Sequence, residues 1–108
     1  MQYKWLEQDL ASINRDTTPW VLVMMHAPFY CSQQDHYLEA SQMRGDMEQM
    51  LNDAGVDMVI NGHVHAYERT LSTFKSKHDA KSCAPAYFNL GDAGNREGPS
   101  VLEDKWRQ

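Results

Sequence analysis

The chain has 108 residues, of which 42% are apolar and 10% aromatic, enough for one small hydrophobic core. Its net charge is -5, from 15 acidic and 10 basic residues, and it has no run of lysine or arginine, so we expect no nucleic acid partner. No apolar run approaches the roughly 18 to 20 residues of a membrane span, and the first residues do not resemble a secretory signal. We therefore expect a small folded domain that is not embedded in a membrane.

The first half of the chain alternates between helical and strand patterns. Between residues 3 and 13, apolar residues recur at helical spacing and predict an amphipathic helix lying on a sheet. Residues 20 to 25 are apolar throughout, which is typical of a strand covered on both faces. A long polar loop follows from residue 26 to 35. The apolar positions of the predicted helix are Trp5, Leu6, Leu10 and Ile13.

A second helical pattern runs from residue 36 or 37 to 54, and Gly55 is its expected stop. Its methionines are predicted to pack in the core, because a flexible thioether fills gaps between a helix and a sheet. Residues 56 to 60 form the next buried strand. The order helix, strand, helix, strand then predicts a parallel pair of strands with a right-handed crossover.

The rest of the chain is predicted to contain shorter elements. Residues 70 to 74 are a candidate strand, residues 75 to 82 a solvated loop, and residues 86 to 90 a third main strand. His78 lies among charged residues of the loop and is interpreted as a surface residue. The glycine-rich stretch from residue 91 to 98 either borders a site or merely reverses the chain. Residues 101 to 107 predict the start of a short helix.

Histidine follows two of the predicted strands. His26 comes directly after residues 20 to 25, and His63 and His65 come shortly after residues 56 to 60. Side chains at i and i+2 of an extended backbone point the same way, so we expect His63 and His65 to converge, with Gly62 allowing a sharp turn. Imidazole is a common ligand of zinc and iron, and strand ends are where α/β sheets carry their sites. Spacing alone is equally compatible with two ordinary loop histidines.

Three sequence blocks around these residues are more specific than the histidine spacing. They are Val23-Met24-Met25-His26-Ala27-Pro28, Gly62-His63-Val64-His65-Ala66-Tyr67-Glu68-Arg69 and Gly91-Asp92-Ala93-Gly94-Asn95. The first two resemble the last two metal-binding blocks of the purple acid phosphatases, which are calcineurin-like metallophosphoesterases, and the third extends the resemblance. The resemblance also includes residues 1 to 6, 18 to 20 and 84 to 90, and it therefore covers nearly the whole chain.

The resemblance implies an α/β fold: half of a four-layer α/β/β/α metallophosphoesterase sandwich, with helix-strand-helix-strand followed by further strands. Residues 1 to 108 would be the C-terminal portion of the catalytic domain, incomplete at both ends. In this family a dinuclear metal centre, iron(III) with zinc, manganese or iron(II), hydrolyses phosphomonoesters as an acid phosphatase. His65 matches the iron ligand, while His26 and His63 match ligands of the divalent metal.

The same resemblance gives His36 a catalytic role. His36 matches an outer histidine that orients the phosphate and protonates the leaving alkoxide, a role that suits an imidazolium at acid pH. Asp35 stands where the family often has another histidine, so we expect a different pH profile or substrate preference. A histidine facing water at a helix start is the alternative interpretation. One of Tyr67, Glu68 and Arg69 is expected to fix the tautomer of a metal-binding imidazole.

The motifs that supply the bridging aspartate of the family do not occur in this sequence. Three histidines without a bridging carboxylate do not hold two hard cations close together, because iron(III) needs oxygen ligands. We therefore expect at most one divalent ion and negligible hydrolysis from this chain alone, with the missing N-terminal half of the domain as its partner. The sequence leaves open whether the chain forms a homodimer.

Two other functions fit the same sequence. One is a non-catalytic half-domain that binds a metal or a partner. The other is a related metallophosphoesterase, such as a nucleotidase or a phosphodiesterase. The family resemblance implies a secreted or vacuolar protein. Cys31 and Cys83 are expected to be free thiols, although one disulfide between them is not excluded by the sequence.

Overall fold

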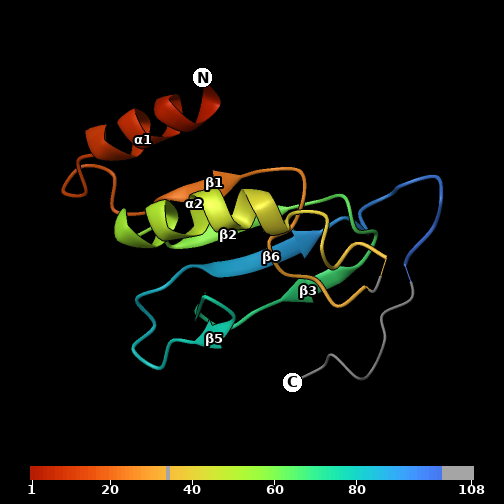
Figure 1. Ribbon diagram of the computed structural model, residues 1–108. Helices are drawn as coiled ribbons and strands as arrows, with labels where there is room; N and C mark the ends of the chain where they lie inside the picture. The colour runs from red at the N-terminus through yellow and green to blue at the C-terminus, as the bar shows by residue number, and fades with distance from the viewer. Residues whose placement is uncertain (34, 101–108) are drawn as a thin grey trace.

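The computed structural model describes residues 1 to 33 and 35 to 100. Figure 1 shows α1 toward the β1 edge of a four-stranded sheet, α2 in front of β1 and β2 and running nearly along them, and the small β4–β5 hairpin on the side of β6 and β3. The helix predicted for residues 101 to 107 lies outside the described residues. In chain order the elements are α1 (Gln2–Ser12), β1 (Leu22–Met24), α2 (Ser41–Asp53), β2 (Met58–Asn61), β3 (Tyr67–Arg69), β4 (Thr73–Phe74), β5 (Lys77–His78) and β6 (Ala86–Leu90).

The main sheet has the strand order β1-β2-β6-β3. Strands β1, β2 and β6 are parallel, and β3 runs antiparallel to β6. This mixed α/β sheet confirms the predicted fold class and the predicted parallel pairing of the first two strands. Since parallel strands end at the same edge, the loops that follow β1 and β2 begin side by side. Those are the two loops that carry His26 and His63.

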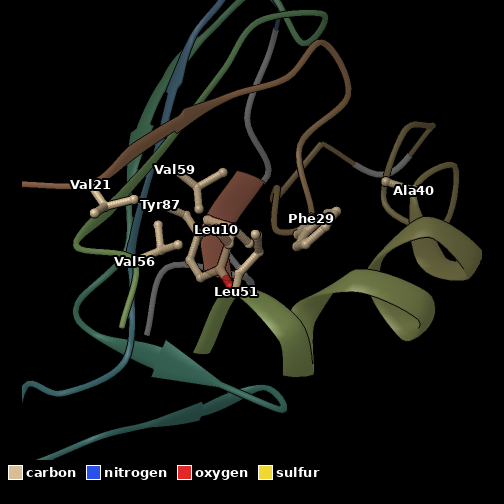
Figure 2. Packing of buried hydrophobic residues seen from close by; sticks show 8 residues of the cluster. All are labelled: Leu10, Val21, Phe29, Ala40, Leu51, Val56, Val59 and Tyr87. Carbon is tan, nitrogen blue, oxygen red and sulfur yellow. The ribbon is translucent and has the colours of Figure 1, made fainter. Parts of the chain in front are cut away.

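The core lies between the helices and one face of the sheet. In Figure 2, Leu10 of α1 and Leu51 of α2 face Val59 and Tyr87 of the sheet. The methionines of α2 pack against this cluster, as predicted, whereas Trp5 of α1 is mostly exposed, so the predicted apolar face of that helix is only partly buried. The buried cluster consists of Leu10, Val21, Phe29, Ala40, Leu51, Val56, Val59 and Tyr87, and the methionines are Met43, Met47 and Met50.

The second helix begins later than predicted but ends as predicted. Residues 35 to 40 form turns, with hydrogen bonds such as Glu39 N–H to the His36 carbonyl (3.1 Å), and α2 starts only at Ser41. At the other end, Gly55 has a φ of 65°. Its N–H donates to the carbonyl of Asn52, and that of Val56 donates to the carbonyl of Leu51, each at 3.0 Å. These are the two hydrogen bonds of a Schellman C-cap, which needs a left-handed residue.

The prediction that the first strand is covered on both faces is wrong. Leu22 and Met24 are 54% and 79% exposed, while Val23 between them packs against the core. A continuous apolar run is typical of double coverage, but within the described residues the helices cover only one face of β1. The sheet therefore has one face on the core and an apolar face that is partly open.

The segment after β3 is also more broken than predicted. Residues 70 to 72 separate β3 from β4, and the expected loop contains β5, which pairs with β4 through Thr73 and His78. His78 is exposed, in agreement with its interpretation as a surface residue. Strand β6 matches the prediction. Cys31 and Cys83 are both free thiols, and among the described residues no helix has the length and apolarity needed to cross a bilayer.

Candidate metal centre

His26 and His63 meet because β1 and β2 are parallel neighbours. His26 follows β1, and its carbonyl accepts a hydrogen bond from the N–H of Gly62 at 3.0 Å, which ties together the loops that follow the two strands. Nε2 of His26 lies 3.0 Å from Nδ1 of His63, and the two rings meet edge to face with centroids 4.8 Å apart. Two predicted metal ligands from distant parts of the sequence are thus in direct contact.

The backbone at His63 differs from the prediction. His63 has a φ of 66°, in the left-handed region, whereas Gly62 before it does not have a positive φ. The extended conformation expected for His63 and His65 is therefore wrong, and the sharp turn occurs at the histidine itself. A non-glycine residue in this region is uncommon and often marks a functional site. In the described ranges, 1–33 and 35–100, no hydrogen bond joins His65 to His26 or His63.

Glu39 connects His63 to His36. Its Oε2 lies 2.8 Å from Nδ1 of His36 and 2.7 Å from Nε2 of His63. The ligand atoms of these three residues all lie within 4.8 Å of one another. The hydrogen bonds from His36 and His63 hold the pKa of the Glu39 carboxyl below its usual 4.5. An ionised Glu39 accepts from both rings, and the tautomers of His26 and His63 decide which of these two rings donates to the other.

His65 lies beside the glycine-rich stretch instead. Its Nδ1 is 3.4 Å from Oε2 of Glu97, and its carbonyl accepts a hydrogen bond from the N–H of Ser100 at 2.6 Å. The stretch from Gly91 to Gly98 therefore borders the loop that carries His65. The structure brings His26, His36 and His63 together and places His65 in a neighbouring environment.

The profile of the family described as calcineurin-like phosphoesterase matches residues 1–67, more than half of the chain. The chain belongs to the calcineurin-like phosphoesterase family. This membership agrees with the resemblance carried by the histidine blocks and with the mixed α/β fold.

Relatives of this calcineurin-like phosphoesterase include plant phosphatases. Purple acid phosphatase 22 of Arabidopsis thaliana is 50% identical over 97 residues, which are 90% of this chain and 22% of that protein. The Fe(3+)-Zn(2+) purple acid phosphatase 12 of the same plant is 42% identical over 90% of this chain and 23% of its own length. The phosphoenolpyruvate phosphatase of Allium cepa is 40% identical over 90% of this chain and 22% of its own length. The chain therefore spans about a fifth of the length of these relatives.

A solved structure supports the same conclusion. The purple acid phosphatase PPD1 from yellow lupin (Lupinus luteus) seeds superimposes with a TM-score of 0.79 at 27% identity, covering 94% of this chain and 19% of that one. The predicted resemblance to purple acid phosphatases and the predicted metallophosphoesterase fold are both confirmed.

The donor atoms beside these histidines could hold a single divalent cation. Imidazole nitrogens of His26 and His63 together with the carboxylate of Glu39 could hold zinc, iron(II) or manganese(II), and His36 shares that carboxylate. Among the described residues, Glu39 is the only carboxylate in hydrogen-bond contact with these histidines. A second, harder ion would need further oxygen ligands.

Tyr67, Glu68 and Arg69, one of which was expected to fix an imidazole tautomer, have other surroundings. Oε1 of Glu68 accepts hydrogen bonds from the N–H and the hydroxyl of Ser32, so Glu68 ties β3 to the loop after His26. Tyr67 and Arg69 are exposed. Within the described part of the chain, none of these three residues forms a hydrogen bond with a histidine ring. The carboxylates beside imidazole rings are Glu39, at His36 and His63, and Glu97, at His65. The sequence signal for Glu39 was its position three residues after His36, within one turn.

A cavity in the described part of the chain is lined by His78 but not by His26, His36, His63 or His65. It has a volume of about 720 Å³, and its lining includes Tyr30 of the loop after β1, Arg44 of α2 and Tyr87 of β6. Burial raises the pKa of Tyr30 to about 12 and also raises that of Tyr87. Both phenols are thus neutral at physiological pH, and neither supplies a tyrosinate or a base there.

Proposed function

We propose that this chain supplies the histidine side of a metal-dependent phosphomonoesterase site, the acid phosphatase activity of its family. The observation that carries the proposal is the convergence of His26, His63 and Glu39 at the ends of two parallel strands, in a member of a phosphoesterase family. A divalent ion bound there counters the negative charge that the acidic chain would otherwise present to a phosphate ester.

Each histidine has a distinct proposed role. His26 and His63 bind the divalent metal, zinc, manganese or iron(II), and His65 binds iron(III) with its Nδ1 oriented by Glu97. The bound ions supply charge for the phosphoryl oxygens and activate a water molecule. His36 is the proton donor: Glu39 holds its Nδ1, and its Nε2 remains free of hydrogen bonds within the described residues.

The dinuclear centre and the activity belong to a longer protein in this proposal. The missing N-terminal half of the domain contributes the oxygen ligands that iron(III) requires. The substrate is a phosphomonoester, and the compartment is secreted or vacuolar, in keeping with the family resemblance. A nucleotidase or a phosphodiesterase remains the alternative, and it predicts a preference for nucleotides or for diesters.

The first test is metal binding by the 108-residue chain. We expect one Zn²⁺ per chain by titration calorimetry, with affinity falling at least about tenfold in His63→Ala. His78→Ala is the matched control, because His78 is exposed and, among the described residues, its ring bonds the carbonyl of Ser72 and no side chain. Absence of Zn²⁺ binding, or equal affinity in both variants, would remove the basis of the proposal.

The second test restores the rest of the domain. Replacing the matching segment of Arabidopsis thaliana purple acid phosphatase 22 by this chain should give a chimera that hydrolyses p-nitrophenyl phosphate, whereas the isolated chain does not. The His36→Ala chimera should keep its metal and lose most of its turnover. Faster turnover of bis(p-nitrophenyl) phosphate than of the monoester would favour the phosphodiesterase alternative.

A second candidate function, a partner-binding half-domain, is supported by the open face of the sheet. Two rows of apolar side chains cross that face in register, and their outer members at β1 are exposed. The expected occupant is the other half of the same domain, since an exposed apolar face of this kind is usually an interface. The rows are Leu22, Met58 and Ala86, and Met24, Ile60 and Phe88.

This candidate is tested by replacing Leu22 and Met24 with lysine. The isolated chain should remain folded and self-associate less in sedimentation velocity. The same replacement in the chimera should lower its melting temperature and its activity together. An unchanged chimera would show that the face is not an interface.

A further inference from the structure

Asn61 is a buried asparagine whose side chain reaches the loop of a histidine on the neighbouring strand. It is 4% exposed and is the last residue of β2. Its Nδ2 lies 3.3 Å from the carbonyl oxygen of Met25 and 3.1 Å from that of Ala27. These are the two peptide carbonyls on either side of His26. One side-chain amide thus binds the backbone before and after a predicted metal ligand.

Asn89 repeats this arrangement one strand further along. It is 2% exposed, lies in β6, and its Nδ2 is 2.9 Å from the carbonyl oxygens of both Val64 and Ala66. Those carbonyls lie on either side of His65. Asn61 and Asn89 are register partners in the sheet. Each member of this asparagine pair therefore spans from its own strand to the histidine loop that follows the neighbouring strand.

A primary amide is suited to this task because a single nitrogen carries two N–H donors. Aspartate has the same shape and no donor, and serine or threonine has only one. The amide oxygens of both asparagines are buried and have no hydrogen-bond partner among the described residues. A buried unpaired oxygen is costly, so these side chains do not simply maximise stability. The feature of each asparagine that the fold uses is the pair of N–H donors on its Nδ2.

We propose that Asn61 and Asn89 are positioning residues that fix the backbone of His26 and His65, respectively, in the geometry needed for metal binding. Metal ligands must be held within about 0.5 Å of a productive geometry, and a loop residue without such restraint does not meet that limit. The metal-binding part of this inference rests on the proposed function, whereas the restraint itself is a property of the chain. His63 is placed differently, by its left-handed backbone and by Glu39.

The test uses the isosteric variants Asn61→Asp and Asn89→Asp in the 108-residue chain. Asn14→Asp is the matched control, since it changes the charge equally. Among the described residues, the Asn14 side chain bonds through its Oδ1 alone, which accepts from the N–H of Asp16 at 2.9 Å. In the metal-free protein, the backbone amide and imidazole NMR resonances of His26 should move in Asn61→Asp, while those of His65 stay in place. The reverse is expected for Asn89→Asp. A merely structural role would move both sets together.

Zn²⁺ binding provides the second measurement. We expect the Zn²⁺ affinity of Asn61→Asp to be about 10 to 100-fold weaker, because His26 contacts the site of the divalent ion. Asn89→Asp should lose less affinity, and Asn14→Asp should lose none. If Asn61→Asp unfolds by circular dichroism, Asn61→Ser keeps one donor without charge and should show an intermediate loss.

Three results would overturn the inference. They are unmoved His26 resonances in Asn61→Asp, equal movement of both histidines in either variant, and unchanged Zn²⁺ affinity in a folded Asn61 variant. A wild-type chain that binds no Zn²⁺ would instead overturn the proposed function and the metal-binding part of this inference. In that case the NMR measurement still decides whether the asparagine pair restrains the histidine loops.

Discussion

Gly91 packs directly against the peptide carbonyl of Val64. A Cβ built on Gly91 would lie 2.0 Å from that oxygen, closer than any nonbonded contact allows, and 3.3 Å from the carbonyl carbon of Gly62. Val64 lies between the two histidines of its block, so the first glycine of the Gly91-to-Asn95 block is required for the histidine loop to lie where it does. Two sequence blocks that are far apart in the chain are thus fitted to each other through the backbone.

Replacing Gly91 with alanine should therefore destabilise the fold and disturb the histidine loop. We expect a loss of about 1–3 kcal/mol in the free energy of unfolding, measured by urea denaturation, because the colliding atoms belong to the backbone and cannot rotate away. Gly45→Ala is the control. Gly45 lies inside α2, and a methyl group added there would meet no atom within 4 Å, so alanine should stabilise by about 0.5–1 kcal/mol. Equal effects of both substitutions would contradict this account.

Replacing Glu39 with glutamine should weaken the binding of a divalent cation. The amide has nearly the same shape but no negative charge, and a single neutral oxygen replaces the carboxylate that accepts from His36 and His63. Zn²⁺ affinity should fall about 10 to 100-fold by calorimetry. Glu7→Gln, on the exposed surface of α1, should leave it unchanged. Affinity close to that of wild type in Glu39→Gln would show that this carboxylate is not part of the site.

Much of the framework was predictable because it depends on local patterns. Apolar runs indicate β1, β2 and β6, and a glycine after a helical period indicates the end of α2 at Gly55. The histidines that follow β1 and β2 are expected at one edge of the sheet, and the contact of His26 with His63 fulfils that expectation. These inferences need only strand periodicity and the rule that parallel strands end together.

The details of the site depend on features that periodicity does not encode. Residues 36 to 40 fit a helical pattern, yet they form turns, and that geometry brings Glu39 against two imidazoles. Intrinsic preference favours a sharp turn at Gly62, yet the left-handed backbone occurs at His63. The roles of Asn61 and Asn89 follow only from the register between β2 and β6. Tertiary contacts decided each of these points.

The ion pair of Arg15 with Asp57 should make the free energy of unfolding depend on pH in the acid range. Arg15 donates to both carboxylate oxygens at 2.9 and 3.2 Å, and the N–H of Val21 donates at 2.8 Å. These contacts, the arginine first, hold the pKa of Asp57 below its usual 3.8. Because the folded state favours the ionised form, the contribution is complete above pH 3.8 and is lost as pH falls through the lower folded-state pKa.

Asp57→Asn should therefore be less stable than wild type at pH 7, by about 1 kcal/mol for a partly exposed bidentate pair. The difference in urea-derived stability should shrink as the pH falls below about 4. Asp16→Asn, at an exposed carboxylate, should match wild type across the same range. A difference that stays constant down to about pH 2 would show that charge is not what Asp57 contributes.

Replacing Tyr30 with phenylalanine should destabilise the junction of α2, the loop after β1 and the β4–β5 hairpin. The Tyr30 hydroxyl donates to the buried carboxylate of Glu48 and accepts from the N–H of Ser76 at 3.0 Å, while the N–H of Lys75 donates to Glu48 at 3.0 Å. Without the hydroxyl, Ser76 loses its acceptor and Glu48 keeps one donor. We expect a loss of about 1–3 kcal/mol at pH 7 by urea denaturation, with Tyr3→Phe, at an exposed tyrosine, as the neutral control.

The same variant gives an alkaline test of the junction. Burial is the main reason that the pKa of Tyr30 rises from 10.0 to about 12. Because the folded state favours the protonated phenol, its contribution is complete below pH 10.0 and is lost as the pH rises toward 12. The stability difference between wild type and Tyr30→Phe should therefore narrow over that interval, whereas Tyr3→Phe should show no such trend. If the difference is unchanged over the whole interval, the hydroxyl does not act through its proton, and the hydrogen bond to Glu48 is not the source of the stability.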